Sequence, residues 1–252
     1  MATKDDLELT IFFPIYRDEA TVERVIRKSF DVAKSLSASF EIVVVNDGSP
    51  DRAGDIAESV AEELGPQVRV IHHGKNLGYG AAIRTGLTSA RGSVICFTDG
   101  DDEYDIYDLQ KIYKIKDYYD LIITFRYVKL YSGYRQFISW VFNNVVRILF
   151  KAKFRDVGTG LRLIRKSLVP EVMPIISNSP FVGAEIAVKT MLKGYRVGEM
   201  GIQTFPREFG SGSSTSFKNI AATIRDLLIV RNTIFSEYYD TNRRDKNGLN
   251  GH

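Results

Sequence analysis

Residues 93–103, Ser-Val-Ile-Cys-Phe-Thr-Asp-Gly-Asp-Asp-Glu, join an apolar run directly to an acidic turn. The run Val94–Phe97 is short and continuous, which is typical of a strand that is buried on both faces. Asp99 and Asp101 stand one residue apart on the turn, so we expect their carboxylates to point to the same side, and Glu103 could supply a third oxygen. Such a set suits a hard divalent cation held together with the phosphate oxygens of a substrate. The alternative is a solvated turn rich in aspartate.

Four further apolar runs of the same kind surround this one. They are residues 9–16, 40–46, 68–73 and 121–127. Between them lie stretches with helical periodicity, such as residues 22–36, where the apolar positions fall on one face. This alternation over short connections predicts a doubly wound α/β fold, with a mostly parallel central sheet flanked by helices. The carboxyl ends of the parallel strands then share one edge of the sheet, where ligands bind in open α/β folds.

The second half of the chain is less regular, but it contains no clean linker and no internal repeat. We therefore expect a single domain over residues 8–236, preceded by a polar segment over residues 1–7. The pattern predicts helices over 134–151, 184–193 and 217–235, and a strand over 195–203. Residues 237–252 are polar and predict a flexible tail.

The composition excludes several classes of protein. A net charge of +3 with a pI of 8.8 is too mild for a nucleic-acid-binding protein, which would need a concentrated basic stripe. The single cysteine, Cys96, cannot form an internal disulfide, which favours a reduced, cytoplasmic setting. The start of the chain is polar and acidic, so we do not expect a signal peptide. The longest apolar segment, residues 137–150, falls short of the roughly 18 residues of a membrane span.

Two other strand ends carry acidic residues and are expected at the same edge of the sheet. Residues 13–19 read Phe-Pro-Ile-Tyr-Arg-Asp-Glu, and residues 45–51 read Val-Asn-Asp-Gly-Ser-Pro-Asp. Asp47 could hydrogen-bond a base or a ribose, although Asp-Gly is also an ordinary turn pair. The glycines of residues 75–80, Lys-Asn-Leu-Gly-Tyr-Gly, fit a dinucleotide-binding loop poorly, and their expected role is tight entry into a helix.

Several segments, taken in order, resemble glycosyltransferase family 2. The segments of the first half are Pro14-Ile15-Tyr16, Asn46-Asp47-Gly48-Ser49, Asn76-Leu77-Gly78-Tyr79-Gly80 and Asp99-Gly100-Asp101. Two segments of the second half resemble the dolichyl-phosphate mannose synthases and the bacterial polyprenyl-phosphate glycosyltransferases of that family. These are Asp156-Val157-Gly158-Thr159-Gly160-Leu161-Arg162, and residues 199–205 followed by Arg207-Glu208-Phe209-Gly210. The resemblance spans residues 8–235 and implies the nucleotide-diphospho-sugar transferase (GT-A) fold.

The resemblance implies a role for each matching residue. Asp99, Asp101 and Glu103 would bind Mg²⁺ or Mn²⁺ at the diphosphate of the donor. The residues that would line the nucleotide-sugar site are Pro14, Tyr16, Asp18, Asp47, Ser49 and Asp99. The arginines that would hold the donor diphosphate or an acceptor phosphate are Arg126, Arg162 and Arg207. For each arginine, an ordinary surface salt bridge is the alternative.

The sequence departs from the family pattern in two places. Arg17 and Asp18 stand where the family usually has Asn and Glu. The loop after Arg207 reads Gly-Ser-Gly-Ser-Ser over residues 210–214 and lacks the usual lysine. This loss weakens the expected contact to an acceptor phosphate and suits a mobile lid.

The reaction that the resemblance implies is inverting transfer of a sugar from a nucleotide diphosphate sugar to a polyprenyl phosphate, such as dolichyl or undecaprenyl phosphate. A phosphate acceptor is already an anion, whereas the alternative, a glycan or other hydroxyl acceptor, requires a base. Glu185 is the candidate base, unless it is only an acid favoured at a helix start, and Asp156 could orient the acceptor. A non-catalytic nucleotide-sugar-binding module is a further alternative, against which the intact pair Asp99 and Asp101 argues.

A lipid acceptor would require contact with a membrane. Residues 134–151 combine Phe137, Trp140 and Ile148 with basic flanks, and residues 217–235 repeat the pattern. Both segments predict interfacial helices that place the protein peripherally on the cytoplasmic face of a membrane. The alternatives are core helices, or contacts with a second copy of the chain or with an integral-membrane partner.

Overall fold

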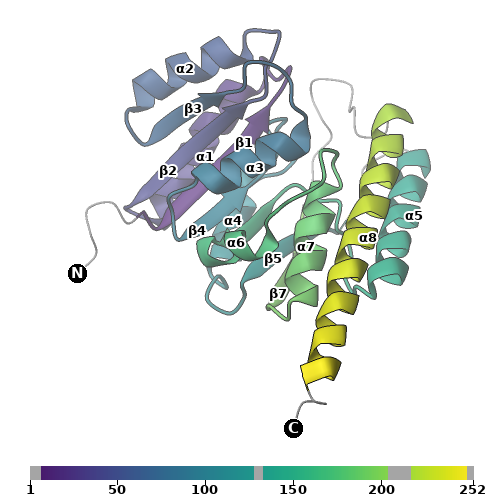
Figure 1. Ribbon diagram of the computed structural model, residues 1–252. Coiled ribbons are helices and arrows are strands. Elements are labelled where there is room, and N and C mark those ends of the chain that lie inside the picture. Colours follow the sequence, from purple (N-terminus) through teal and green to yellow (C-terminus); the bar gives the residue numbers. More distant parts are fainter. Residues whose placement is uncertain (1–6, 128–132, 204–216, 249–252) are drawn as a thin grey trace.

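A computed structural model describes residues 7–127, 133–203 and 217–248 of the chain and contains a seven-stranded sheet (Figure 1). The strands are β1 (Leu9–Ile15), β2 (Phe40–Asn46), β3 (Val68–His72), β4 (Val94–Phe97), β5 (Leu121–Arg126), β6 (Arg162–Arg165) and β7 (Val197–Ile202). Their order across the sheet is β3-β2-β1-β4-β6-β5-β7. Neighbouring strands are parallel except where β6 pairs with β4 and β5. The predicted α/β fold with a mostly parallel sheet is confirmed.

Helices cover both faces of the sheet. The helices of one face are α1 (Val22–Leu36), α2 (Ala53–Leu64) and α4 (Leu109–Tyr113), which share a core with Ile11 and Phe13 of β1. The helices of the other face are α3 (Tyr79–Ser89), α5 (Gly133–Phe150), α6 (Val169–Val172), α7 (Val182–Leu192) and α8 (Phe217–Gly248). They share a second core with Phe12 and Phe97, whose rings stack at 5.4 Å. Successive strand residues point to opposite faces, and both faces are covered, so the strands are continuous apolar runs.

The strand order reverses between β1 and β4. Strands β2 and β3 lie on one side of β1, and β4 lies on the other. In open α/β sheets such a reversal leaves a crevice at the carboxyl ends of the two strands, and ligands bind there. The Thr21 hydroxyl in the loop after β1 donates to the Gly100 carbonyl in the turn after β4 (2.9 Å). The acidic turn therefore lies at the edge of the sheet where its sequence position predicts it.

Two elements differ from the expectation. The sequence does not predict β6, because this strand has only four residues and begins and ends with arginine. The last helix is also longer than expected, since α8 continues to Gly248 and includes most of the segment 237–252 that we expected to be a flexible tail. No Gly or Pro interrupts residues 217–247, and extending an existing helix costs less than starting a new one.

A buried carboxylate joins the segments at the opposite edge of the sheet. Glu41 in β2 accepts hydrogen bonds from the Thr10 hydroxyl (2.8 Å), the Arg69 guanidinium (2.9 Å) and the Arg91 backbone N–H (2.7 Å). Burial alone would raise the pKa of Glu41, but the hydrogen bonds from Arg69 and Arg91 outweigh it and hold that pKa below its usual value. One side chain thus connects β1, β2, β3 and the turn before β4.

We expect Glu41→Gln to lower the free energy of unfolding by about 2 kcal/mol at neutral pH, because it removes the charge that Arg69 and Arg91 pair with. The folded-state pKa is depressed, so the stabilisation is complete above the unfolded value of 4.5 and is lost as pH falls through the folded pKa. Urea unfolding of wild type and variant, at neutral pH and at about pH 3, measures the free energy of unfolding under both conditions. The difference between wild type and variant should shrink on acidification, and a constant or growing difference would contradict this account.

Candidate active site

The loops after β1 and β2 are tied together at the carboxyl edge of the sheet. The backbone N–H of Arg17, which has a left-handed φ of 64°, donates to the Ser49 hydroxyl (2.7 Å). The N–H of Tyr16 donates to the Asp18 carboxylate (2.9 Å), and the Tyr16 ring is exposed beside them. Pro14, Tyr16, Asp18 and Ser49 therefore lie at the edge where the sequence places them. Their roles toward a nucleotide stay predictions.

Helix α1 stabilises the acidic turn after β4. Asp102 has a left-handed φ of 57°, a conformation that Asp tolerates better than most residues. Its carboxylate forms ion pairs with Arg24 (2.7 Å) and Lys28 (3.0 Å), both from α1. Asp102 therefore fixes the backbone between Asp101 and the residues that follow, a role that the sequence reasoning missed.

Asp99 and Asp101 are the carboxylates that a divalent cation could use. Asp99 Oδ1 accepts a hydrogen bond from the Tyr79 hydroxyl (2.6 Å), and Asp101 Oδ1 accepts one from the Glu103 N–H (3.1 Å). Glu103 is buried, and within the described residues no three acidic, His or Cys side chains form a metal-binding group. The predicted set of three carboxylates that includes Glu103 is therefore absent. Two carboxylates still fit Mg²⁺ or Mn²⁺, because Mg²⁺ is usually bound by one or two carboxylates plus substrate phosphates and water.

Asp47 holds a loop in place, and its predicted contact with a base or ribose stays a prediction. Its Oδ1 accepts the N–H of Leu77 (2.9 Å) and lies 2.7 Å from His73 Nδ1, and its Oδ2 accepts the N–H of Gly78 (2.9 Å). The side chain is buried. Both oxygens thus help to shape the connection between β3 and α3, which gives the Asp-Gly pair a role in the fold.

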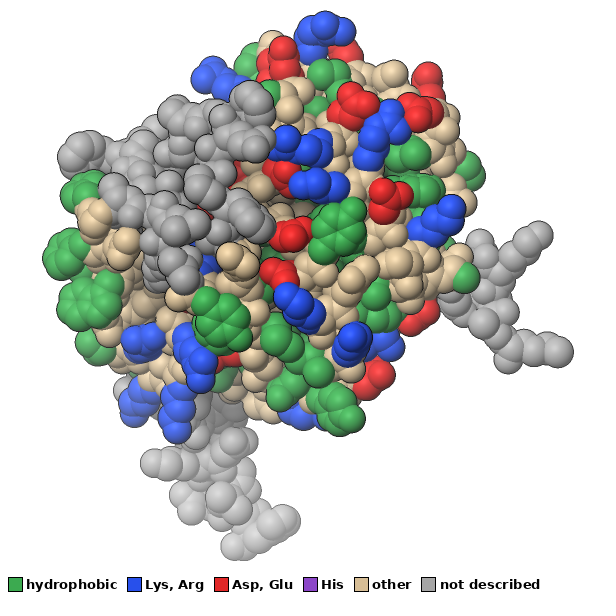
Figure 2. Space-filling model, turned by 180° about the vertical axis from the view of Figure 1, so that it is seen from behind, with side chains coloured by type: hydrophobic (Ala, Val, Ile, Leu, Met, Phe, Trp, Pro, Cys, Tyr) green, Lys and Arg blue, Asp and Glu red, His purple; other side chains and the backbone are tan. Residues whose placement is uncertain are grey.

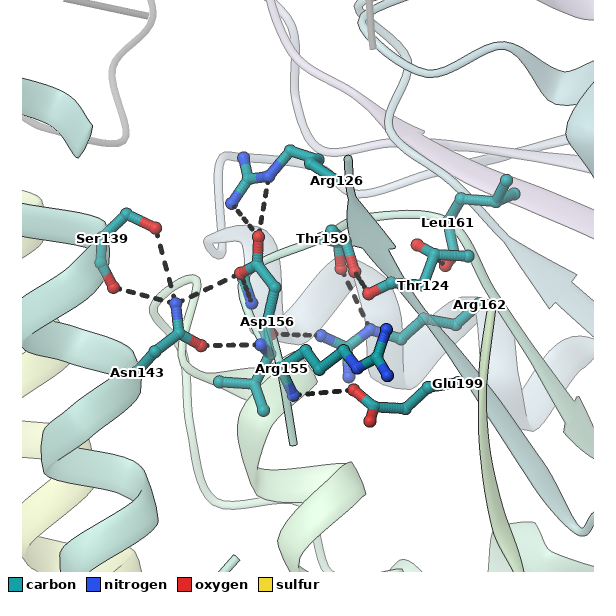
Figure 3. A network of polar contacts seen from close by, with 12 residues as sticks. Thr124, Arg126, Ser139, Asn143, Arg155, Asp156, Thr159, Leu161, Arg162 and Glu199 are labelled. Atoms are coloured by element: carbon teal, nitrogen blue, oxygen red, sulfur yellow. Dashed lines mark hydrogen bonds and ion pairs between the residues drawn. The ribbon is translucent and has the colours of Figure 1, made fainter. Parts of the chain in front are cut away.

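Arg126 and Asp156 form a buried ion pair (Figure 3). Asp156 Oδ2 accepts Arg126 Nε at 2.9 Å and lies 2.8 Å from Nη2. Burial alone would lower the pKa of Arg126, but the neighbouring Tyr104 and Asp156 more than compensate and raise it. The guanidinium at the end of β5 therefore stays charged. Contact of Arg126 with a phosphate stays a prediction, as does an orienting role for Asp156.

Asn143 of α5 binds the segment that carries Asp156 (Figure 3). Its Nδ2 donates to Asp156 Oδ1 (3.2 Å) and to the Ser139 carbonyl (2.8 Å), and its Oδ1 accepts the Val157 N–H (2.9 Å). The sequence reasoning assigned no role to Asn143. The signal that could have identified it is a buried amide on the inner face of an otherwise apolar helix, since such a group requires partners.

Arg162 corrects the prediction of a phosphate contact. It is 1% exposed and donates to the carbonyls of Val157 (2.5 Å), Thr159 (3.1 Å) and Gly183. Burial lowers the pKa of its guanidinium. Its position at the start of β6 turns the side chain toward the core, beside the ring of Phe97. Arg162 therefore binds backbone groups of the fold and does not reach solvent.

Both carboxylate oxygens of Glu185 also have protein partners, which argues against its predicted role as a base. Its Oε1 and Oε2 accept the N–H groups of Ile176 and Ser177, both at 2.8 Å. Lys189, one turn along α7, forms an ion pair with it at 2.6 Å. The side chain is fully buried, and its hydrogen bonds to the two backbone N–H groups anchor the loop before α7.

Arg207 and its loop lie outside the described residues, as do residues 210–214. The phosphate contact of Arg207 and the lid over residues 210–214 therefore stay predictions. The strand expected before this loop is present as β7, which is parallel to β5 and ends at the same edge as Arg126.

Comparisons with known proteins agree with this architecture. The sequence model of the family described as Glycosyl transferase family 2 matches residues 10–172. An undecaprenyl-phosphate 4-deoxy-4-formamido-L-arabinose transferase from Pseudomonas paraeruginosa is 27% identical over 175 residues, which cover 69% of this chain and 52% of the relative. A dodecaprenyl-phosphate galacturonate synthase from Rhizobium johnstonii is 26% identical over 236 residues, or 92% of this chain and 68% of the relative. The chain thus spans about half the length of the first relative.

Solved structures of low sequence identity share the fold. The glucosyl-3-phosphoglycerate synthase from Mycobacterium tuberculosis, in complex with Mn²⁺, UDP and glucosyl-3-phosphoglycerate, superposes with a TM-score of 0.67. It is 16% identical, and the match covers 90% of this chain and 80% of that one. This likeness confirms the GT-A fold.

We expect Arg162→Met to lower the free energy of unfolding by about 3 kcal/mol, because it leaves three backbone carbonyls without their donor. Arg165→Met is the matched control, since Arg165 also donates to backbone carbonyls from β6 but is partly exposed, and its loss should cost about 1 kcal/mol. Urea unfolding measures both values. An Arg162→Met protein of normal stability that had lost nucleotide binding would instead favour the phosphate contact.

Proposed function

Because the chain belongs to glycosyl transferase family 2, we propose that it transfers a sugar from a nucleotide diphosphate sugar to a polyprenyl phosphate. The names of the two relatives described above contain undecaprenyl phosphate and dodecaprenyl phosphate, which supports this class of acceptor. The observation that carries the proposal is the placement of the acidic turn at the reversal of strand order, with the charged Arg126 at the same edge. The pair Asp99 and Asp101 supports an enzyme over a binding module without activity, because a metal held there would also stabilise the leaving diphosphate.

The donor would lie across the ends of β1 and β4. In this proposal the loop with Tyr16 and Asp18 lines the nucleoside, and Asp99 and Asp101 hold Mg²⁺ or Mn²⁺ at the diphosphate. When bound, such a metal neutralises charge that develops on the leaving diphosphate. Arg126 suits a phosphate group because its planar guanidinium matches phosphate oxygens and stays charged beside Asp156.

The acceptor would react as an anion. A phosphate oxygen of the polyprenyl phosphate attacks the anomeric carbon, the bond from that carbon to the diphosphate breaks, and the configuration inverts. No base is required, because the attacking oxygen carries no proton at neutral pH. The full occupation of Glu185 by two backbone N–H groups and Lys189 supports this acceptor over a hydroxyl acceptor that would use Glu185 as its base.

We expect Asp101→Asn to lower kcat/KM about 100-fold or more, because it removes one of two anionic ligands for the metal at the diphosphate. The assay measures release of nucleoside diphosphate from UDP- and GDP-sugars, with Mn²⁺ and undecaprenyl phosphate in detergent. Asp117→Asn is the control, since Asp117 is exposed next to α4 and contacts Lys116 and Arg165. A wild-type protein that neither binds nor turns over any donor with Mn²⁺ would refute the proposal.

The outer faces of α5 and α8 are suited to a membrane surface. These helices lie next to each other in Figures 1 and 3. The exposed apolar residues are Tyr134, Phe137, Trp140, Val141 and Ile148 of α5, and Ile224, Leu228, Ile229 and Phe235 of α8. Figure 2 shows hydrophobic side chains at the edge where α5 lies, with Lys and Arg side chains below them. An apolar face beside basic residues is what an anionic membrane surface binds.

The exposure of its side chains shows whether α5 is a core helix or a surface helix. Val146 and Phe150 are buried in the core, whereas Trp140 is 61% exposed and Ile148 is 76% exposed. Helix α5 is therefore an amphipathic surface helix and not a wholly buried core helix. None of the helices in the described residues is both long enough and apolar enough to cross a bilayer. Contact with a bilayer, a second copy of the chain or an integral-membrane partner stays a proposal, and we favour the bilayer because of the basic residues at 151, 153 and 155.

We expect the protein to co-sediment with liposomes that contain phosphatidylglycerol, and salt should weaken this binding because it screens the basic residues. The double variant Phe137→Asp/Trp140→Asp should weaken binding at least about tenfold, since it places charge on the apolar face. Tyr118→Asp is the control, because Tyr118 is exposed and lies outside α5 and α8. Failure of the wild type to bind anionic liposomes at any salt concentration would contradict membrane docking, and dimerisation that the double variant abolishes would assign the face to a second copy.

A further inference from the structure

Tyr79 makes a direct contact with the acidic turn. It is the first residue of α3, and its hydroxyl donates to Asp99 Oδ1 at 2.6 Å. Its ring is partly buried against the core that α3 shares with α7 and α8. The tyrosine lies within the Asn-Leu-Gly-Tyr-Gly segment, where sequence reasoning assigned a role only to the glycines.

The backbone on both sides of Tyr79 is fixed by other segments. Before it, the N–H groups of Leu77 and Gly78 donate to Asp47 (both 2.9 Å). After it, the N–H of Gly80 donates to the Asn178 carbonyl (3.1 Å). Residue 80 must be glycine, because a Cβ atom would overlap with the Ser177 carbonyl. The Tyr79 ring therefore has little freedom to move away from Asp99.

The loop that supports Gly80 is itself held by two charged side chains. Arg84 of α3 donates to the carbonyls of Ile175 (3.2 Å) and Ser177 (2.9 Å). Asp226 of α8 accepts the N–H groups of Asn178 and Ser179, both at 2.9 Å. Residues 175–179 thus form a rigid support for the start of α3, connected to both α3 and α8.

The opposite side of the Asp99 carboxylate is closed by Gly160. A Cβ atom at this position would overlap with Asp99 Oδ2 and approach the ring of Tyr104 to 2.9 Å. The carboxylate therefore lies between a hydroxyl donor on one side and the backbone of the Asp156–Arg162 segment on the other. A hydrogen bond to Oδ1 still lets the carboxylate bind a cation, since each carboxylate oxygen has two lone-pair directions.

We propose that Tyr79 is a positioning residue, which holds the Asp99 carboxylate in one orientation for the divalent metal and the donor diphosphate. This inference rests on the proposed function, because it assumes that Asp99 contacts those groups. Without the hydroxyl, the carboxylate would populate several rotamers, and ligand binding would have to select one of them. Tyr79 itself touches neither the metal nor the sugar in this proposal.

The test is Tyr79→Phe, with Tyr113→Phe as its matched control. Tyr113 of α4 also donates its hydroxyl to a carboxylate, that of Glu8 (2.5 Å), but at the opposite edge of the sheet. Both variants should lower Tm by a similar amount, because each loses one hydrogen bond between a tyrosine and a carboxylate. Mn²⁺ binding is measured by electron paramagnetic resonance in the presence of UDP and, separately, of GDP. We expect the Kd for Mn²⁺ to rise about tenfold in Tyr79→Phe and to stay within about twofold of wild type in Tyr113→Phe.

The outcomes separate this inference from the proposed function. If wild type binds Mn²⁺ with a nucleotide and Tyr79→Phe binds it equally well, the positioning role is wrong while the proposed function stands. If wild type binds no Mn²⁺ with either nucleotide, both are wrong. Should Tyr79→Phe fail to fold, Gly160→Ala decides, because it displaces Asp99 from the other side and leaves the tyrosine in place. An unchanged Mn²⁺ affinity in Gly160→Ala would then overturn the inference.

Discussion

Burial of both faces of the central sheet is the constraint on which the rest of the molecule depends. Helices α1, α2 and α4 cover one face and α3, α5, α6, α7 and α8 cover the other, and the polar side chains within the central strands, such as Thr10 of β1 and Glu41 of β2, are buried. In β1 and β4, which are buried along their whole length, polar groups that meet a ligand must therefore lie at the strand ends. At the carboxyl edge the reversal of strand order between β1 and β4 adds a crevice, and the acidic turn lies beside it.

The same constraint explains why so many charged residues near this edge bind protein groups. A loop that packs against the sheet must find partners for its backbone N–H groups, and a carboxylate supplies two acceptor oxygens. Asp47, Glu185 and Asp226 each accept two backbone N–H groups from a neighbouring loop. Arg162 does the reverse and donates to carbonyls. Asp99 and Asp101 differ from these residues because they lie on the turn itself and remain partly exposed.

The sequence predicts the parts of the structure that depend on periodicity and on strand ends. The strands β1 to β5 and the helices α1 to α3 follow from the alternation of apolar runs with helical periodicity, and the location of Asp99 and Asp101 follows from the acidic turn after β4. The direction in which a charged side chain points cannot be predicted in this way. Arg126 and Arg162 are both motif arginines near the same edge, yet one lies at the end of β5 in an ion pair and the other is buried under α7. Asp47 and Asp99 are distinguished only by the three-dimensional path of the loops around them. The tyrosine at position 79 is equally hidden in the sequence, because its contact is with a residue twenty positions away.

The two faces of α5 connect the proposed membrane surface to the proposed site. Its outer face carries Phe137 and Trp140, whose rings stack at 6.2 Å, and its inner face carries Asn143. Asn143 binds Asp156, and Asp156 binds Arg126, so two consecutive contacts lead from the helix to the guanidinium at the end of β5. In the proposed function, the helix that would rest on the bilayer also fixes the arginine that the acceptor phosphate would approach. The two contacts hold Arg126 at a fixed position relative to the outer face of α5, as would suit an acceptor that moves only in the plane of a membrane.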